Sequence, residues 1–443
     1  MKNGTDQKEV VKKFLFLSKD DQISYEVSLD KKRGNFLRKK DEALAEAKAN
    51  EIHAKAIEDK CKEALKSENL VILTGAGSSM DGGGKSVSEI WEELLGKDEV
   101  EAQKELYLNK VLGLVTKKIE EIKKEKFFDK KNLEELLSRL EIERKAAKNR
   151  GEENKEISDQ IKEINTQIKK LCSVPNSEPK THQTFLTKIL AARKKTSPRA
   201  KIFTLNYDTF FEDAASEIKA VVIDGFCFNE KRIFNSTDFD LDIVQRENSR
   251  IHKEENFYDK VFHLYKMHGS VTWQLEGREI KKLDKSQIKK DEEPLLIYPN
   301  ASKFEESYQM PFYEMISRFQ ISLRATNTTL MIIGYSFGDA HVNRMIEEAV
   351  DSNLSLKVIV VDPNVDGEKT KEEEHENLKN MLINHAKNSA RIMFFGATFK
   401  DFVKELPEIS YENEREKTLK EAIDEALKEA LKAPKKNEEK ISE

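Results

Sequence analysis

Cysteine is scarce in this chain, with three residues in 443. Cys61, Cys172 and Cys227 lie far apart, and no Cys-x-x-Cys pair occurs. A zinc ribbon built from cysteines is therefore excluded, and a disulfide framework is not expected. Apolar runs are all shorter than the roughly 18 residues of a membrane span, and the amino terminus lacks the apolar core of a signal peptide. The sequence predicts a soluble, cytoplasmic protein that does not bind membranes.

A strong excess of positive charge is also missing, because the formal net charge is -5. A globally basic nucleic-acid binder is not indicated, and we expect no direct binding of nucleic acid. Charged residues nevertheless make up 36% of the chain, above the roughly 25% of an ordinary domain. This excess predicts long, solvated helices.

Composition divides the chain into four parts. Residues 1–66 read as an N-terminal helical extension, residues 99–177 as a helical insertion, and residues 406–443 as a helical tail with an amphipathic helix at 416–431. In the remainder, 67–98 and 178–405, short apolar runs alternate with helical stretches. The runs expected to be strands are residues 69–74, 201–205, 220–223, 261–267, 295–298, 330–334, 356–361 and 391–395. This alternation predicts an α/β fold, a Rossmann-like parallel sheet flanked by helices.

Within the helical insertion, apolar residues recur with 4-3-4-3 spacing. They are Ile157, Ile161, Ile164, Ile168 and Leu171. Two heptads are fewer than a coiled coil normally needs, so the seam can equally pack within its own domain. The segment 149–154 is the expected turn of a helical hairpin. The seam and the terminal helices together favour a homo-oligomer.

Polar motifs follow several of the expected strands. They are Thr74-Gly75-Ala76-Gly77-Ser78-Ser79, Thr204-Leu205-Asn206-Tyr207-Asp208, His268-Gly269-Ser270 and Gly334-Tyr335-Ser336-Phe337-Gly338-Asp339. Open α/β sheets bind ligands at the carboxyl ends of their strands, so these motifs predict one shared crevice. Glycines let a backbone approach a pyrophosphate, and free amides at a helix start can hold its charge. A P-loop ending at Gly84-Lys85-Ser86 is disfavoured, because Ser79 stands where that motif requires glycine.

Taken in order, these motifs resemble the sirtuin family, the silent-information-regulator fold that uses NAD. The resemblance covers roughly residues 68–98 and 178–365. Gly75-Ala76-Gly77-Ser78 resembles the dinucleotide loop, Asn206 lies in a segment like Thr-Gln-Asn-Ile-Asp, and His268-Gly269 matches the catalytic pair. Gly334-Tyr335-Ser336 resembles the phosphate turn, and Pro179 with His182 echoes the start of a family helix.

The departures from the family pattern are informative. The four-cysteine zinc module of protein-deacylating sirtuins cannot be built here, and a helical block stands in its place. The segment around Trp91 and the run from Gly334 to His341 look more like sirtuin-like effectors of bacterial anti-phage systems, which hydrolyse NAD. The resemblance implies a separate partner protein, such as a HerA-type ATPase.

The resemblance implies NAD as the substrate and no metal. Cleavage of the nicotinamide–ribose bond creates an oxocarbenium-like ribose. The site must therefore exclude bulk water and position one water molecule for the attack. His268 is expected to act as general base, Asn206 to orient substrate or water, and Asp208 to orient a partner or support the developing cation. The residues expected to bind the dinucleotide are Gly75, Ala76, Gly77, Ser78, Gly334, Ser336, Asp362 and Asn364.

Structural interpretations compete with several of these roles. Asn206 could simply cap the helix that begins near Asp208, Ser336 could be a turn residue, and His182 favours a structural role. Trp273 favours the core or a pocket wall. The leading hypothesis is an NAD glycohydrolase that gives ADP-ribose and depletes NAD on infection. The alternatives are a module that senses NAD or ADP-ribose without turnover, an ADP-ribosyltransferase and a zinc-free deacylase.

Overall fold

The computed structural model describes the chain in several segments. Short strands are described at residues 10–12, 16–17, 22–23, 26–29 and 36–38, and the remainder of the description covers 58–95, 110–114, 133–151, 155–194, 196–244, 257–288, 311–363 and 376–409. In these segments no helix is both long and apolar enough to cross a membrane.

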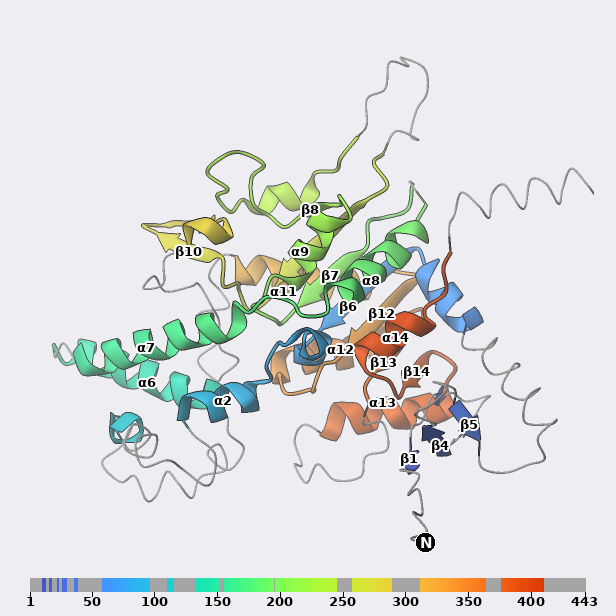
Figure 1. The fold of residues 1–443 in the computed structure, drawn as a ribbon, viewed down its shortest axis with the longest axis horizontal. Coiled ribbons are helices and arrows are strands. Elements are labelled where there is room, and N and C mark those ends of the chain that lie inside the picture. Colours follow the sequence, from blue (N-terminus) through green and yellow to red (C-terminus); the bar gives the residue numbers. More distant parts are fainter. Residues whose placement is uncertain are drawn as a thin grey trace, which may run out of the picture.

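A parallel sheet forms the centre of the fold (Figure 1). Its seven parallel strands, among the described residues, run in the order β14 (Ile392–Phe395), β13 (Lys357–Val361), β12 (Thr328–Ile333), β6 (Asn69–Thr74), β7 (Lys201–Thr204), β9 (Val261–Lys266) and β8 (Val221–Ile223). The expected Rossmann-like α/β fold is confirmed.

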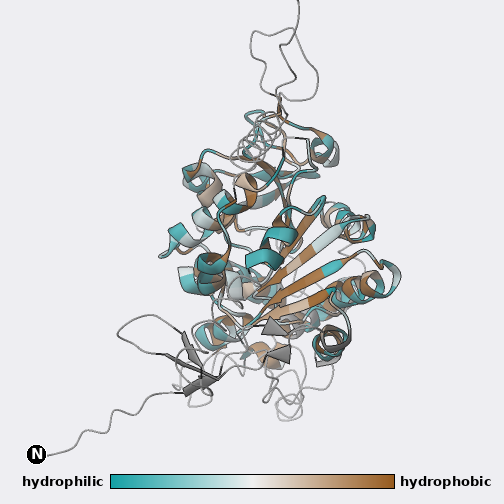
Figure 2. Cartoon of the chain, turned by 90° about the vertical axis from the view of Figure 1, so that its right-hand side faces the viewer, coloured by the Kyte–Doolittle hydropathy of each residue, from teal (hydrophilic) through white to brown (hydrophobic). Residues whose placement is uncertain are grey.

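Helices cover both faces of this sheet, and Figure 2 shows apolar strands between helices with hydrophilic outer surfaces. One face packs against α8 (Pro179–Ala191), α9 (Phe210–Glu217), α14 (Phe399–Glu405) and a helix at residues 58–65. The other packs against α11 (Phe312–Arg324), α12 (Ala340–Ser352) and α13 (Glu376–Asn388). Successive residues of β6 alternate between the two cores, with Ile72 in one and Val71 and Leu73 in the other. Such strands need apolar residues at every position, which explains their continuous apolar runs.

The order of the strands reverses between β6 and β12. From β6 the chain continues to β7 on one side, whereas β12, formed much later, pairs with the other side of β6. The loops that follow β6 and β12 therefore leave the sheet in different directions. In open α/β sheets a ligand crevice lies at such a switch point.

The amino-terminal segment departs from the predicted helical extension. The strands β2 (Phe16–Leu17) and β3 (Gln22–Ile23) extend the main sheet antiparallel beside β14. A separate small sheet contains β1 (Val10–Lys12), β4 (Glu26–Leu29) and β5 (Phe36–Arg38). The prediction of helix was wrong for these residues, because the high charge of the segment concealed short runs of β-branched and aromatic residues that favour strands.

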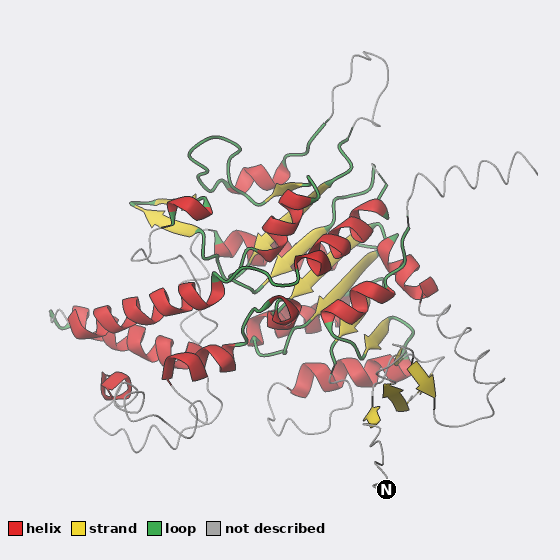
Figure 3. Cartoon of the chain, viewed as in Figure 1, coloured by secondary structure: helices red, strands yellow, loops and turns green. Residues whose placement is uncertain are grey.

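The helical insertion folds as a hairpin that protrudes from the sheet domain (Figure 3). It contains α6 (Leu133–Asn149) and α7 (Lys155–Cys172), and it packs against α2 (Val87–Leu95). The first four isoleucines of the 4-3-4-3 seam are buried in one apolar cluster with Trp91, and Leu171 packs against it. The seam thus packs within the chain, against α2 and α6.

Some elements differ from the sequence-based expectations. The hairpin of β10 (Trp273–Glu276) and β11 (Glu279–Lys282) was not predicted, and neither was α14. The expected strand at 295–298 and the expected helix at 416–431 lie outside the described residues.

Candidate functional site

The loop after β6 packs directly against the turn after β12. Gly75 N donates to Ile333 O at 3.1 Å, and Gly77 N donates to Gly334 O at 2.9 Å. Gly334 has a φ of 60°, and a Cβ atom there would lie 2.5 Å from the carbonyl carbon of Gly77. A side chain at this position would strain the backbone and collide with the opposite loop. These glycines therefore allow two loops to meet backbone to backbone at the switch point.

The hydrogen bonds of the glycine loop reduce the number of backbone amides with which it can bind an anion. The amides of Gly75, Gly77, Ser78 and Ser79 all donate to protein carbonyls. The expectation of several free amides at a helix start is therefore wrong for these four positions. The loop forms two short 3-10 turns, Ala76–Ser78 and Met80–Gly82, and α2 begins only at Val87.

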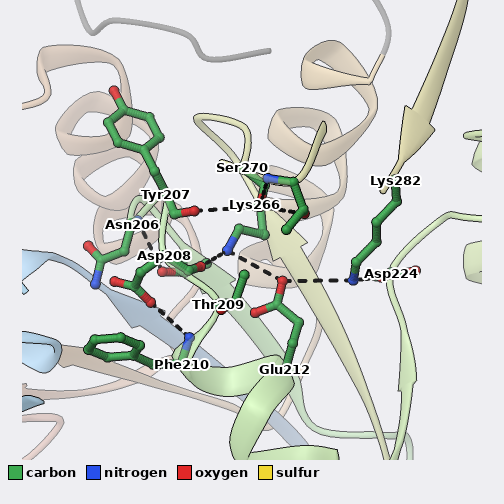
Figure 4. A network of polar contacts seen from close by, with 12 residues as sticks. Asn206, Tyr207, Asp208, Thr209, Phe210, Glu212, Asp224, Lys266, Ser270 and Lys282 are labelled. Atoms are coloured by element: carbon green, nitrogen blue, oxygen red, sulfur yellow. Dashed lines mark hydrogen bonds and ion pairs between the residues drawn. The ribbon is translucent and has the colours of Figure 1, made fainter. Parts of the chain in front are cut away.

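Asn206 lies at the end of β7 and points its side chain into this loop (Figure 4). Its Nδ2 donates to Gly75 O at 2.9 Å, to Ser78 Oγ at 3.1 Å and to Ser79 Oγ at 2.8 Å. A carbonyl oxygen only accepts, so the contact with Gly75 fixes which end of the amide is nitrogen. The carboxamide therefore joins the segment after β7 to the loop after β6. Its neighbour Tyr207 packs against the apolar cluster of the helical insertion.

Asp208 is fully enclosed and serves the start of α9. Its Oδ1 accepts from Phe210 N at 3.0 Å, and its Oδ2 accepts from Ser79 Oγ at 2.7 Å. Burial raises the pKa of Asp208, although Lys266 and these hydrogen bonds oppose the rise. The first amide of α9 thus donates to the carboxylate of Asp208. This contact argues against Asn206 as the residue that caps the helix. In this structure Asp208 orients Ser79 and, through it, the amide of Asn206.

His268 follows β9 and contacts a residue that follows β12. Its Nε2 lies 3.0 Å from Asp339 Oδ2, and both side chains are buried, with 8% and 4% of their surface exposed. In the sheet, β6 and β7 lie between β9 and β12, which separates them by about 14 Å. The contact can form only because both loops fold inward over the ends of β6 and β7. His268 therefore lies above the switch point, on the same edge as Asn206.

Several hydrogen bonds hold Asp339 in place. Its Oδ1 accepts from the amides of His341 and Val342, so the residue caps α12. The hydroxyl of Tyr335 donates to Asp339 O at 3.0 Å and also lies 3.1 Å from the amide of the same residue. One carboxylate oxygen is thus anchored to the helix while the other faces His268. A carboxylate only accepts, so Nε2 of the imidazole carries the proton and the basic lone pair lies on Nδ1.

The remaining predicted residues differ in their surroundings. Ser336 is exposed, beside the turn at Gly334. Asp362 follows β13 and accepts from Lys379 Nζ at 2.7 Å, a partner that the sequence did not suggest. Asn364 lies outside the described residues. Trp273 is buried in the core, as expected.

His182 has the structural surroundings that the sequence favoured. Three aromatic rings, those of Phe210, Phe211 and Phe399, meet its imidazole edge-on. Burial lowers the pKa of His182 to about 4, so the ring is neutral at physiological pH. Among the described residues, no three His, Cys, Asp or Glu side chains gather as a metal ion would require.

Two groups of functional interest were not singled out from the sequence. Asp339 was noticed only as the end of a motif, although an Asp just before a helix is a recognisable cap. Ser79 was treated as part of the glycine loop, yet its hydroxyl joins Asn206 to Asp208. Neither contact leaves a signal in the spacing of residues, because each links segments that are far apart in the chain.

Comparison with known proteins finds a family to which part of this chain is similar. Residues 200–386 match the model of the SIR2-like domain, whereas the glycine loop at Gly75 lies outside the match. A solved structure described as "Structural Basis for the Mechanism and Regulation of Sir2 Enzymes" aligns with 79% of this chain and 94% of its own at 12% identity, with a TM-score of 0.37. Comparison with curated proteins finds no match. Over residues 200–386, which contain Asn206, His268 and Asp339, the chain is sirtuin-like.

Proposed function

We propose that this protein is an NAD glycohydrolase that releases nicotinamide and ADP-ribose. The observation that carries the proposal is the contact of His268 with Asp339 above the switch point, on the same edge of the sheet as Asn206. A titratable ring with a carboxylate partner is the arrangement by which enzymes hold a general base in one tautomer. SIR2-like domains are associated with NAD, which supplies the substrate class.

In the proposed reaction, the oxygen of one water molecule attacks C1′ of the ribose attached to nicotinamide. The bond between C1′ and the pyridine nitrogen breaks, and its electron pair leaves with neutral nicotinamide. Nδ1 of His268 takes the proton of the attacking water, and Asp339 stabilises the imidazolium that results. The histidine then returns the proton to solvent, so the balance is NAD⁺ and water to nicotinamide, ADP-ribose and a proton.

Asn206 is proposed to set the position of the reacting groups. Its nitrogen is fixed by the glycine loop and two serines, so its Oδ1 is held on the opposite side of a rigid amide. An uncharged acceptor of this kind can orient water or a ribose hydroxyl without changing the charge of the site. The residues proposed to hold the dinucleotide remain Gly75, Ala76, Gly77, Ser78, Gly334, Ser336, Asp362 and Asn364. Ala76 and the exposed Ser336 are the better placed of these to meet a phosphate, because four neighbouring amides are engaged.

The test is to incubate the purified protein with NAD and to measure nicotinamide release. We expect release by the wild type and a loss of at least about 100-fold in both His268→Ala and Asn206→Ala, the usual scale of a general base. His385→Ala is the matched control, because it removes a half-buried imidazole on α13, away from the described contacts of the site. Tight NAD binding without release in the wild type would refute hydrolysis and support a sensor. Release that requires an acylated peptide would support deacylation, and ADP-ribose attached to protein would support transfer.

We further propose, from the resemblance to sirtuin-like anti-phage effectors, that the reaction depletes NAD during infection. A separate protein, such as a HerA-type ATPase, would control it, and the chain would act as a homo-oligomer. Light scattering of the purified chain measures its assembly state. Co-expression with the product of a neighbouring gene, followed by NAD measurement in infected cells, tests the control. Unchanged NAD during infection would overturn this role without affecting the proposed reaction.

A further inference from the structure

Four contacts join the segment that contains Asn206 to the segment that contains His268. Met267 N donates to Thr204 O at 2.9 Å, and Val271 N donates to Tyr207 O at 3.1 Å. The other two come from side chains, because Ser270 Oγ donates to Tyr207 O at 3.5 Å and Lys266 Nζ donates to the backbone carbonyl of Asp208. The donors lie on both sides of His268 and the acceptors on both sides of Asn206. Together the contacts fix how the imidazole lies relative to the carboxamide.

Lys266 is unusual among these groups because it brings a charge into the interior. The residue has 2% of its surface exposed. Its Nζ lies 3.4 Å from Oε1 of Glu212, which is on α9 (Figure 4). A buried ammonium is costly unless it is paired and hydrogen-bonded, and Lys266 meets both conditions through Glu212 and the Asp208 carbonyl.

The pairing continues beyond Glu212 toward the β10–β11 hairpin. Oε1 of Glu212 also lies 3.8 Å from Lys282 Nζ, and Lys282 Nζ lies 2.5 Å from Asp224 Oδ2. Burial acts to raise the pKa of Glu212, but Lys266 and Lys282 outweigh it and hold the pKa below its ordinary value. Four charges of alternating sign, on side chains that are 3–13% exposed, thus run from the end of β9 to β11 and the end of β8.

We propose that Lys266 is a positioning residue, which holds the Asn206–Asp208 segment at its working distance from His268 and is itself held by Glu212, Lys282 and Asp224. The expected effect of Lys266 on the rate of nicotinamide release rests on the proposed NAD hydrolysis. Its expected effect on the position of the Asn206–Asp208 segment does not. Of the four contacts between the segments, those of Lys266 and Ser270 come from side chains, and that of Lys266 is the one made by a charged group. A displacement of the segment by about 1 Å can cost about 100-fold in rate.

The first experiment compares Lys266→Met with Lys266→Arg. We expect Lys266→Met to lower kcat for nicotinamide release by about 100-fold while KM for NAD stays nearly unchanged, because the dinucleotide is held by other loops. Lys266→Arg keeps a charged donor and should recover a large part of the rate. In parallel, the amide hydrogens of residues 205–210 should exchange faster in Lys266→Met than in the wild type.

Lys188→Met is the matched control, because Lys188 is also a buried lysine bonded to backbone carbonyls. Its Nζ donates to Val403 O at 3.0 Å and to Leu406 O at 2.6 Å, at the end of α14. This variant should lower the melting temperature without the change in kcat and without faster exchange at 205–210. Equal loss of kcat in both variants would show that Lys266 acts only through stability, which would overturn the proposal.

A double variant covers the case in which Lys266→Met folds poorly. Lys266→Met with Glu212→Gln removes both charges of the pair, so stability should partly return. Because the hydrogen bond to Asp208 is still missing, kcat should stay low and exchange at 205–210 should stay fast. Return of both to the wild-type values would overturn the proposal. If the wild type releases no nicotinamide, the proposed function fails, and unchanged exchange in Lys266→Met would then separately refute the positioning role.

Discussion

Two buried histidines of this protein differ in their neighbours, because one contacts a carboxylate and the other lies among aromatic rings. At the carboxyl edge of the sheet, His268 meets the carboxylate of Asp339, which itself is anchored to the start of α12. Behind α8, His182 is surrounded by aromatic rings, and its Nε2 is buried with no hydrogen-bond partner. The two side chains are similarly hidden from solvent, so burial does not distinguish them.

The difference lies in what each region can do with an added proton. An imidazolium at position 268 would be compensated by Asp339, whereas one at position 182 would lie among three aromatic rings and beside the neutral amide of Asn176. Charge without a partner is strongly disfavoured in an interior of low dielectric constant. The two histidines of this chain are therefore distinguished by their partners and their place on the sheet, and not by their exposure.

The largest expected effect is the difference in activity between a substitution beside His268 and one at His182. We expect Asp339→Asn to lower nicotinamide release by about 100- to 1,000-fold, because a neutral amide no longer stabilises the imidazolium of His268. Asparagine is also a good helix cap, so α12 should keep its start and the melting temperature should change little. His182→Phe serves as the control and should retain most of the activity. Rates measured at saturating NAD, together with melting curves, make the comparison.

Two outcomes would break this contrast. Wild-type turnover in Asp339→Asn would mean that the carboxylate serves only α12, and His268 would lose its proposed partner. A large loss of turnover in His182→Phe without loss of stability would mean that the aromatic region takes part in the reaction.

The glycines give a second contrast, between the carboxyl edge and the β10–β11 turn. Gly334 and Gly277 have similar φ values, 60° and 65°, but a Cβ atom on Gly334 meets Gly77 at 2.5 Å while one on Gly277 meets nothing within 4 Å. Gly277→Ala should cost about 1–2 kcal/mol of unfolding free energy from backbone strain alone. Gly334→Ala should cost about 2–5 kcal/mol, because the opposite loop must also move.

Urea denaturation of both glycine variants gives the two free energies. Equal losses would contradict the close approach of the loops after β6 and β12. A larger loss in Gly334→Ala, accompanied by weaker NAD binding, would support the role of this contact in shaping the crevice.

The fold was largely predictable because its signals are local. Continuous apolar runs mark strands buried on both faces, and β6 has the predicted bounds, Asn69–Thr74. The turn expected at 149–154 likewise separates α6 from α7, and the isoleucine seam lies on α7. The short strands before residue 40 were missed because charge dominates their composition. Residues 273–282 were missed as a hairpin because their alternation is brief and rich in charge.

The candidate site was predictable only in outline. The motifs after β6, β7, β9 and β12 had to meet at one edge, because parallel strands end there. Which groups pair at that edge depends on contacts that span the chain. His268 and Asp339 are 71 positions apart, and Ser79 and Asp208 are 129 positions apart. The sequence also could not show that the amides of the glycine loop donate to its own carbonyls and to those of the neighbouring strand and turn.

The smallest expected effect is the contribution of His182, in the aromatic region, to the pH dependence of the unfolding free energy. Burial lowers the pKa of His182 to about 4, from 6.5 in the unfolded chain. Between these values the unfolded state binds a proton that the folded state does not, so stability is present above about pH 6.5 and is lost as pH falls toward 4. From about pH 7.5 to about pH 5, His182 should account for a loss of about 2 kcal/mol.

Urea denaturation at the two pH values, on the wild type and on His182→Phe, measures this loss. His263 should behave in the same way, because burial, aided by Lys201, lowers its pKa to about 4 as well. Replacing His182 should therefore remove part of the acid sensitivity and leave the share of His263, whatever the variant does to stability at neutral pH. An unchanged difference between the two pH values would show that His182 accepts a proton in the folded state. The aromatic region would then tolerate charge as the carboxyl edge does, and the distinction between the two histidines would depend on Asp339 alone.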